Sequence, residues 1–292
     1  MHIGVLSSPN SWYFNDLLRA ADGRHQIAAC SFGQLSTFLS PEVLGFQSGD
    51  QNLADFDAVL VRTMPPGSLE QVVFRMDILA RLEVSGCLVV NPPRAIETAV
   101  DKYLALARLR AADLDIPDTC VCQTVDDAMI GFEKLGGDVV IKPLFGSEGR
   151  GIMRVSNVDL ALRAFKMLEQ LGAVIYLQRF IEHEGFDYRL LVIGERVLGI
   201  RRRNNTDWRT NVSRGAVAEP LELDEHLVSI ARTAATAVSA PLAGVDVLPS
   251  RDGRCLVLEV NAVPGWKSLS TTLDTDVADL VLRYLEDSFA SL

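Results

Sequence analysis

The segment Leu256–Gly265, which reads LVLEVNAVPG, constrains the fold more than any other stretch of the chain. Its apolar residues predict a buried strand, and the Pro-Gly pair ends it. Side chains alternate between faces along a strand, so Glu259 and Asn261 point to the same face. Asp246 lies within a similar apolar run, AGVDVL. We therefore expect neighbouring strands to bring together two carboxylates and an amide oxygen, hard ligands that suit Mg²⁺ (or Mn²⁺) beside substrate phosphates.

Composition narrows the class of protein. The chain has 292 residues, of which 48% are hydrophobic, so it can bury a sizeable core over two or three domains. Its formal net charge of −10 argues against general nucleic-acid binding, which needs a broad basic surface. Five cysteines at irregular spacing indicate reduced thiols. We expect a cytoplasmic protein with no signal peptide and no membrane span.

The first part of the chain alternates between strand and helix signals, which predicts a parallel sheet. We assign this domain to residues 1–95. Its expected strands are His2–Leu6, Gln26–Cys30, Asp57–Arg62 and Cys87–Val90, and its expected helices are Ser11–Ala21 and Leu69–Val84.

The remaining chain divides into a central part, residues 96–180, and a strand-rich last part, residues 181–292. The expected helices are Thr98–Ala112, Asp159–Leu171, Asp224–Ala240 and Asp276–Ser288. The expected strands are Val139–Lys142, Ile152–Val155, Val174–Arg179, Asp187–Ile193, Glu195–Arg203, Ala243–Leu248 and Cys255–Val260. The first two of these strands enclose a glycine-rich loop and therefore predict a hairpin.

That loop reads GSEGRG, which matches neither the dinucleotide fingerprint nor the Walker pattern. Its glycines can still approach phosphates closely, with free N–H groups facing the anion. The loop residues proposed to contact phosphate are Gly146, Ser147, Gly149 and Gly151. Lys142, just before the loop, strengthens this interpretation, because a lysine on a strand can reach ATP phosphates. The alternatives are an ordinary flexible hairpin and a solvated lysine.

A strand that becomes a connector, YLQRFIE, offers an apolar slot and aligned backbone groups for an adenine ring. The residues assigned to this slot are Gln178, Arg179, Phe180 and Ile181. Asp187 follows and can accept hydrogen bonds from ribose hydroxyls. A plain core strand is the alternative.

Arginines are concentrated between Arg189 and Arg214, where the only acidic residues are Glu195 and Asp207. Arginine forks match carboxylate and phosphate oxygens, so this positive window indicates polyanionic ligands. Arg201 and Arg203 share a strand face, and we expect Arg203 to bind an acidic acceptor. The alternative is a solvated strand face. No nucleophile motif of the G-x-S-x-G or cysteine type is present.

Six segments in this order resemble an ATP-grasp ligase, and within that superfamily the chain is similar to the RimK-like glutamate ligases. They are DKYLALARL, VVIKPLFGSEGRGI, YLQRFIEHEGFDYRLLVIGERVLG, RTNVSRGA, GVDVL and LEVNAVPGW. The resemblance implies an α/β ATP-grasp fold behind an N-terminal Rossmann-like pre-ATP-grasp domain that helps to bind the acceptor.

The resemblance also implies roles for individual residues. Lys102 and Lys142 would contact nucleotide phosphates, with Arg209 and Asn211 nearby. Arg189 and Arg214 would stabilise the transferring phosphoryl group or a substrate carboxylate. Asp246, Glu259 and Asn261 would hold Mg²⁺. Many relatives carry an acidic residue where this chain has Gln178 or Arg179, which puts the contact to the adenine amino group in doubt.

The expected reaction joins a carboxylate to an amine through an acyl phosphate, at the expense of ATP. L-Glutamate is the expected amine, and a small tetrahydromethanopterin-like cofactor is the expected acceptor. We expect the loop Thr63–Ser68 and the pair Trp266-Lys267 to shape the acceptor pocket, with Trp266 stacked on a pterin-like ring. The open alternatives are a protein C-terminus as acceptor, another amino-acid ligase and a nucleotide-binding module without turnover. The oligomeric state also stays open, a homo-oligomer included.

Overall fold

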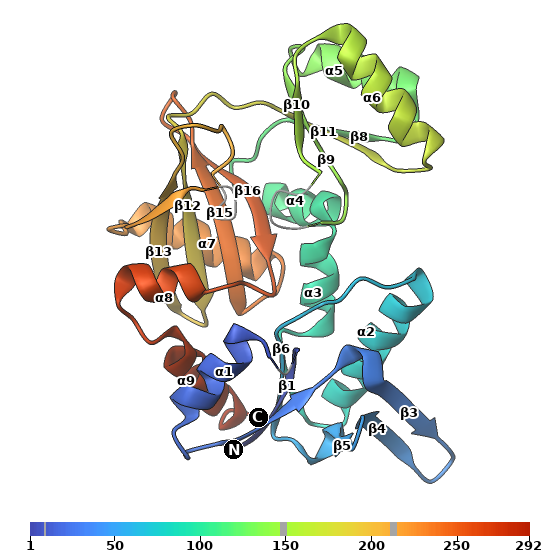
Figure 1. The fold of residues 1–292 in the computed structure, drawn as a ribbon, viewed down its shortest axis with the longest axis vertical. Coiled ribbons are helices and arrows are strands. Elements are labelled where there is room, and N and C mark those ends of the chain that lie inside the picture. Colours follow the sequence, from blue (N-terminus) through green and yellow to red (C-terminus); the bar gives the residue numbers. More distant parts are fainter. Residues whose placement is uncertain (9, 147–150, 211–214) are drawn as a thin grey trace.

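The computed structural model describes residues 1–8, 10–146, 151–210 and 215–292. Its strands form one parallel sheet, two larger antiparallel sheets and one small three-stranded sheet. In Figure 1 the parallel sheet lies at the bottom with both chain termini, and the sheet that carries the glycine-rich loop lies at the top. The mixed α/β class expected from the sequence is confirmed.

The parallel sheet has the strand order β2-β1-β6-β7, so β1 lies in the interior beside β6. Its strands are β1 (His2–Leu6), β2 (Gln26–Cys30), β6 (Ala58–Val61) and β7 (Leu88–Val90). Every residue of β6 is buried, as expected for a continuous apolar strand covered on both faces. The helices of this region are α1 (Trp12–Ala21), α2 (Leu69–Val84) and α3 (Pro93–Val100). Ser68 and Gln71 form a capping box that begins α2.

Between β2 and β6 the chain forms a small antiparallel sheet that the sequence did not predict. It comprises the 3₁₀ helices η1 (Phe32–Gln34) and η2 (Leu53–Asp55) and the strands β3 (Leu35–Leu39), β4 (Leu44–Ser48) and β5 (Gln51–Asn52). Most residues of β3 are exposed, so this strand lacks the apolar alternation that marks a half-buried strand.

The single helix predicted over Thr98–Ala112 is wrong, because the chain forms two helices there. After α3 ends, Asp101 adopts an extended conformation and its side chain accepts hydrogen bonds from the backbone N–H groups of Tyr103 and Leu104. Asp101 is therefore the N-cap of α4 (Lys102–Ala111). Lys102 becomes the first residue of a new helix.

The second large sheet is antiparallel, in the order β10-β9-β11-β8, and has its own apolar core under two helices. Its strands are β8 (Thr119–Cys122), β9 (Val139–Lys142), β10 (Met153–Val155) and β11 (Ile175–Arg179), and its helices are α5 (Val125–Lys134) and α6 (Val158–Gln170). The predicted hairpin around the glycine-rich loop is confirmed by the pairing of β9 with β10. Neither β8 nor α5 was predicted.

The third large sheet is antiparallel in the order β14-β13-β12-β15-β16. Its strands are β12 (Phe186–Ile193), β13 (Arg196–Arg203), β14 (Val217–Pro220), β15 (Leu242–Pro249) and β16 (Cys255–Asn261). The helices of this part are α7 (Glu225–Ala237), α8 (Lys267–Leu273) and α9 (Val277–Phe289). Helix α7 covers one face of the sheet, packing against β12, β15 and β16.

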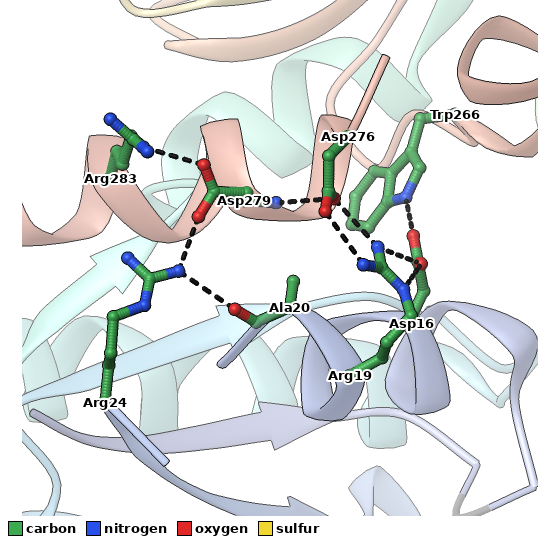
Figure 2. A network of polar contacts seen from close by, with 8 residues as sticks. All are labelled: Asp16, Arg19, Ala20, Arg24, Trp266, Asp276, Asp279 and Arg283. Atoms are coloured by element: carbon green, nitrogen blue, oxygen red, sulfur yellow. Dashed lines mark hydrogen bonds and ion pairs between the residues drawn. The ribbon is translucent and has the colours of Figure 1, made fainter. Parts of the chain in front are cut away.

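The last helix, α9, packs against α1 and so brings the end of the chain to its beginning. Arg19 donates to both carboxylate oxygens of Asp276 at 2.8 Å, and Arg24 pairs with Asp279 at 2.5 Å (Figure 2). The three larger sheets fall within residues 2–90, 119–179 and 186–261. The domain boundaries near residues 95 and 180 stay predictions. No helix in the described ranges combines the length and the apolar character that a membrane crossing requires.

Candidate active site

The strand register of the third sheet lines up charged residues across three neighbouring strands. Arg189 on β12 lies directly opposite Asp246 on β15, and Asp246 lies opposite Glu259 on β16. Asn261 follows two residues after Glu259, on the same face, and pairs in register with Gly244. The expected proximity of Asp246, Glu259 and Asn261 therefore holds, and their role as metal ligands stays a prediction.

Two arginines enclose the carboxylate of Asp246. Arg189 Nη1 donates to Asp246 Oδ1 at 2.6 Å, and Arg202 Nη2 lies 3.0 Å from Oδ2. Arg202 also forms a two-pronged ion pair with Asp187, at 2.8 Å from Nε and 2.6 Å from Nη2. Burial disfavours the ionised form of Asp246, but the two arginines outweigh burial and lower its pKa to about 2. Arg202 was not among the predicted site residues, although it stands inside the arginine-rich window.

Glu259 contrasts with Asp246, because it forms no hydrogen bond or ion pair within the described ranges of the chain. Burial, together with the charge of Asp246, raises the pKa of Glu259. The charges of Lys142, Arg189 and Lys102 oppose this rise in pKa, and a bound Mg²⁺ would oppose it further. The donor set fits the metal, since it offers oxygen ligands alone. No group of three or more His, Cys, Asp or Glu side chains in the described ranges is placed to hold a metal, so Asn261 would be needed to complete the set.

Gly244 makes the contact between Arg189 and Asp246 possible. A Cβ atom at this position would lie 2.5 Å from Arg189 Nη2 and 2.6 Å from its Cζ. Any side chain would therefore push the guanidinium out of its place beside Asp246. The sequence could have signalled Gly244, since a glycine inside an otherwise apolar strand marks a close approach by another group.

The two predicted phosphate-binding lysines face the start of the glycine-rich loop and the second sheet. Lys102 Nζ donates to the carbonyl oxygen of Gly146 at 2.7 Å. Lys142 Nζ donates to Gln178 Oε1 at 2.5 Å, and Gln178 is buried on β11. Burial lowers the pKa of Lys142 to about 8 and also lowers the pKa of Lys102. Both ammonium groups lack the full solvation of a surface lysine and would gain from an anionic ligand.

A cleft runs between the second and third sheets and collects many of the predicted residues. Those that line it are Lys142, Gln178, Arg179, Phe180, Ile181, Asp187, Arg209, Asp246 and Glu259. Trp208 and His183 also line it and were not predicted to belong to the site. The rings of Phe180 and Trp208 meet edge to face at 5.8 Å, so an aromatic wall flanks the connector between the two sheets.

Three predicted residues already form ion pairs that compete with their assigned roles. Asp187, predicted to bind ribose, is buried and already occupied by Arg202. Arg179 pairs with Asp118 at 3.0 Å, and its side chain is half exposed. Arg209 lines the cleft and donates to Asp207 from both Nε and Nη2. Each of the three must exchange or share a partner in order to bind nucleotide.

Arg203 is not brought to the cleft. It lies on the other face of β13 from Arg202, near Glu219 at 3.9 Å and with its guanidinium 4.8 Å from the ring of Phe186. Arg201 shares that face and pairs with Glu219 at 2.6 Å. The contact of Arg203 with an acidic acceptor stays a prediction, because strand alternation says which residues share a face but not which face meets a ligand.

Four predicted residues lie outside the described ranges, namely Ser147, Gly149, Asn211 and Arg214. Of the remaining loop residues, Gly146 and Gly151 have φ angles of +150° and +72°. Such conformations favour glycine, since a Cβ atom would be strained there. The two ends of the predicted phosphate-binding loop therefore need glycine for their backbone shape.

The prediction that Trp266 stacks on an acceptor ring is wrong. Trp266 is fully buried, and its Nε1 donates to Asp16 Oδ2 at 2.9 Å (Figure 2). Its ring packs against Tyr13 and over the guanidinium of Arg62. The indole therefore belongs to the core between the first and last parts of the chain, where an aromatic residue is more common than on a ligand surface.

The architecture is that of the ATP-grasp fold, as solved structures show. The ATP-grasp ligase PsnB, complexed with minimal precursor, Mg and ADP, superimposes with a TM-score of 0.77 over 98% of this chain and 97% of its own, at 20% identity. Among relatives of known sequence, tetrahydromethanopterin:alpha-L-glutamate ligase of Methanosarcina acetivorans is 32% identical, with 98% of each chain covered. Ribosomal protein bS6–L-glutamate ligase of Escherichia coli is 29% identical, covering 98% of this chain and 96% of that protein.

Residues 99–285 match the RimK-like ATP-grasp domain. The chain belongs to the RimK-like ATP-grasp family and is an ATP-dependent ligase. The resemblance and the ATP-grasp fold expected from the sequence are therefore confirmed.

Proposed function

We propose that this protein joins L-glutamate to a small carboxylate-bearing cofactor, with ATP bound in the cleft between the second and third sheets. The observation that carries the proposal is the pair Asp246 and Glu259 on one sheet, which lines the same cleft as Lys142 on the other. Acids beside unneutralised lysines suit a metal–triphosphate ligand, because each charge then meets its opposite. The relatives named for a small pterin acceptor support the choice of acceptor class.

Each part of the cleft has a proposed task. The backbone of Gln178–Ile181 and the aromatic wall of Phe180 and Trp208 would hold the adenine. Lys102, Lys142 and the glycine-rich loop would bind the phosphates, with Arg209 beside them. Asp246, Glu259 and Asn261 would hold Mg²⁺. When bound, the metal would neutralise charge on the phosphate oxygens.

The proposed reaction begins with a carboxylate of the acceptor attacking the γ-phosphate of ATP, which gives an acyl phosphate and ADP. Arg189 would add positive potential at the transferring group. The amine of L-glutamate then attacks the acyl carbon, phosphate leaves, and the amine loses a proton as the amide forms. No enzyme nucleophile is needed. A closed loop over the nucleotide would exclude water from the acyl phosphate.

The test is a panel of carboxylate acceptors with ATP, Mg²⁺ and L-glutamate. ADP release reports turnover, and mass spectrometry reports the number of glutamyl units added. We expect ADP release that depends on both L-glutamate and one small polyacid. Modification of a protein or peptide acceptor alone would overturn the small-acceptor proposal. Nucleotide binding without amino-acid-dependent ADP release from any acceptor would overturn the ligation of glutamate.

A further inference from the structure

Arg62 is a buried cation that the reaction proposed above does not use. It directly follows β6, is 4% exposed, and donates from Nη2 to the carbonyl oxygen of Pro264 at 2.7 Å. Its Nε and Nη1 atoms are buried, and neither has a hydrogen-bond partner among the residues that the structure describes. A buried charge without a counter-ion is costly, so natural proteins seldom leave one unpaired.

Two aromatic rings lie against the guanidinium of Arg62. Its Cζ lies 4.1 Å from the ring centre of Trp266 and 4.9 Å from that of Tyr13. Trp266 is held by Asp16 of α1, as Figure 2 shows, and Gly265 gives Tyr13 its room, since a Cβ there would lie 2.5 Å from the tyrosine Oη. Both rings stabilise the cation, and neither gives Nε or Nη1 a hydrogen-bond partner.

The position of Arg62 in the sheet is one where ligands bind. The chain runs from β1 to β2 on one side and later returns to β6 and β7 on the other side of β1. The edge beyond the carboxyl ends of β1 and β6 is therefore a topological switch point, the usual ligand crevice of an open parallel sheet. Arg62 stands at this edge, and its backbone N–H donates to the carbonyl oxygen of Leu6 at 3.0 Å.

Arg62 also contacts the turn that follows β16, the strand that carries Glu259 and Asn261. Pro264, which accepts from Arg62, lies three residues after Asn261 in the turn that follows β16. A ligand that reached Arg62 would therefore lie between the first sheet and the strand end that carries the proposed metal ligands. The loop 63–68, which follows Arg62 and forms neither helix nor strand, borders this place.

Another buried arginine in the same domain, Arg75, has different surroundings. Arg75 of α2 is also buried, lies beside an aromatic ring and donates to a proline carbonyl, that of Pro65 at 2.8 Å. None of its side-chain nitrogens is both buried and unpartnered in the described ranges. A buried arginine can therefore donate to a proline carbonyl without leaving other side-chain N–H groups unpaired, whereas Arg62 leaves Nε and Nη1 unpaired in the same ranges.

We propose that Arg62 binds a carboxylate of one of the two molecules that the enzyme joins, through Nε and Nη1. The carboxylate would come either from the incoming L-glutamate or from the acceptor, and guanidinium geometry matches both. This inference rests on the proposed ligase function. It adds a carboxylate subsite in the first domain, beside the turn that follows Asn261.

The experiment compares the wild-type protein with Arg62→Lys and Arg62→Met, and uses Arg24→Met as the control. Arg24 links the first domain to α9 through Ala20 and Asp279 and touches no proposed site residue. The KM values for L-glutamate, acceptor and ATP are measured separately. We expect the KM of one carboxylate substrate to rise about tenfold or more in both Arg62 variants, with the KM of ATP changed less than about twofold. The substrate whose KM rises identifies the source of the carboxylate.

A measurement without turnover separates this proposal from the ligase proposal. If the carboxylate comes from L-glutamate, then L-glutamate and glutarate should each raise the melting temperature of the wild-type protein. If it comes from the acceptor, the acceptor should raise the melting temperature instead. Arg62→Lys should lose that rise even though it keeps a cation. If all KM values stay unchanged, or if Arg62→Lys loses stability while keeping the ligand-dependent rise, then Arg62 is a structural link and the proposal fails. Absence of glutamate-dependent ADP release from the wild type would overturn the ligase proposal instead.

Discussion

Buried arginines lie in two regions of this protein, and the surroundings of their guanidinium groups differ. In the third sheet, Arg189 and Arg202 are paired with Asp187 and Asp246 at 2.6–3.0 Å. At the edge of the first sheet, Arg62 has aromatic rings and one carbonyl oxygen but no carboxylate. In the proposed function, the paired arginines would keep an acidic site in place for nucleotide and metal. The unpaired arginine leaves the carboxylate to be supplied by a ligand.

The largest effect should come from Glu259→Gln, which tests the acidic side of the comparison. We expect ADP release to fall at least about a hundredfold, because the substitution removes a charged oxygen ligand for the metal. The melting temperature should stay the same or rise, since burial already penalises the ionised form of Glu259. Enzyme assays measure the ADP release, and thermal unfolding measures the melting temperature. Turnover like that of the wild type would contradict the metal assignment.

The next effect should come from Arg202→Met, which removes one cation from the paired region. Two buried carboxylates would lose their shared partner, so we expect the free energy of unfolding to fall by about 3–5 kcal/mol. Arg203→Met is the matched control on the opposite face of the same strand, and its half-exposed pair with Glu219 should contribute about 1 kcal/mol or less. Denaturant unfolding measures both values. Equal losses would show that the two faces are not distinct.

Smaller effects should follow from adding a methyl group beside each kind of arginine. Gly244→Ala should displace Arg189 from Asp246 and lower ADP release about tenfold, because one cation at the transferring phosphoryl group is misplaced. Gly265→Ala should displace Tyr13 from Arg62 and raise the KM of a carboxylate substrate, with little change for ATP. Steady-state kinetics with each substrate varied in turn distinguishes the two. The same kinetic change in both variants would show that the two regions do not differ in function.

The smallest effect is a dependence of ATP affinity on pH. Burial lowers the pKa of Lys142 to about 8, so above that pH the free protein increasingly holds a neutral amine. ATP binding favours the charged form and should weaken as the pH rises through 8, by at most about tenfold per pH unit. Lys142→Arg stays charged and should flatten this dependence. Titrations of a non-hydrolysable ATP analogue between pH 7 and 9.5 check it, and an equally steep slope in both proteins would exclude Lys142 as its source.

Local patterns predicted much of the fold, and their failures have physical causes. The buried strand β6 was predicted from its continuous apolar run. The hairpin of β9 and β10 was predicted from two apolar strands on either side of a glycine-rich loop. The break at Asp101 was missed, although an aspartate before a helical run is a common N-cap. The exposed strand β3 was missed because it shows no apolar face. Trp266 was misjudged because its type alone does not reveal burial.

The sequence by itself determined the chemistry of this protein and the spacing of its acids along β15 and β16, because strand alternation depends on local backbone geometry. Only the tertiary structure decided that Arg202, and not Arg203, meets Asp246, since the strand register is set by pairing between distant segments. The surroundings of Arg62 were likewise decided by folding. Tyr13, Arg62 and the segment Pro264–Trp266 are far apart in the chain and meet only when the last helices pack back onto the first sheet.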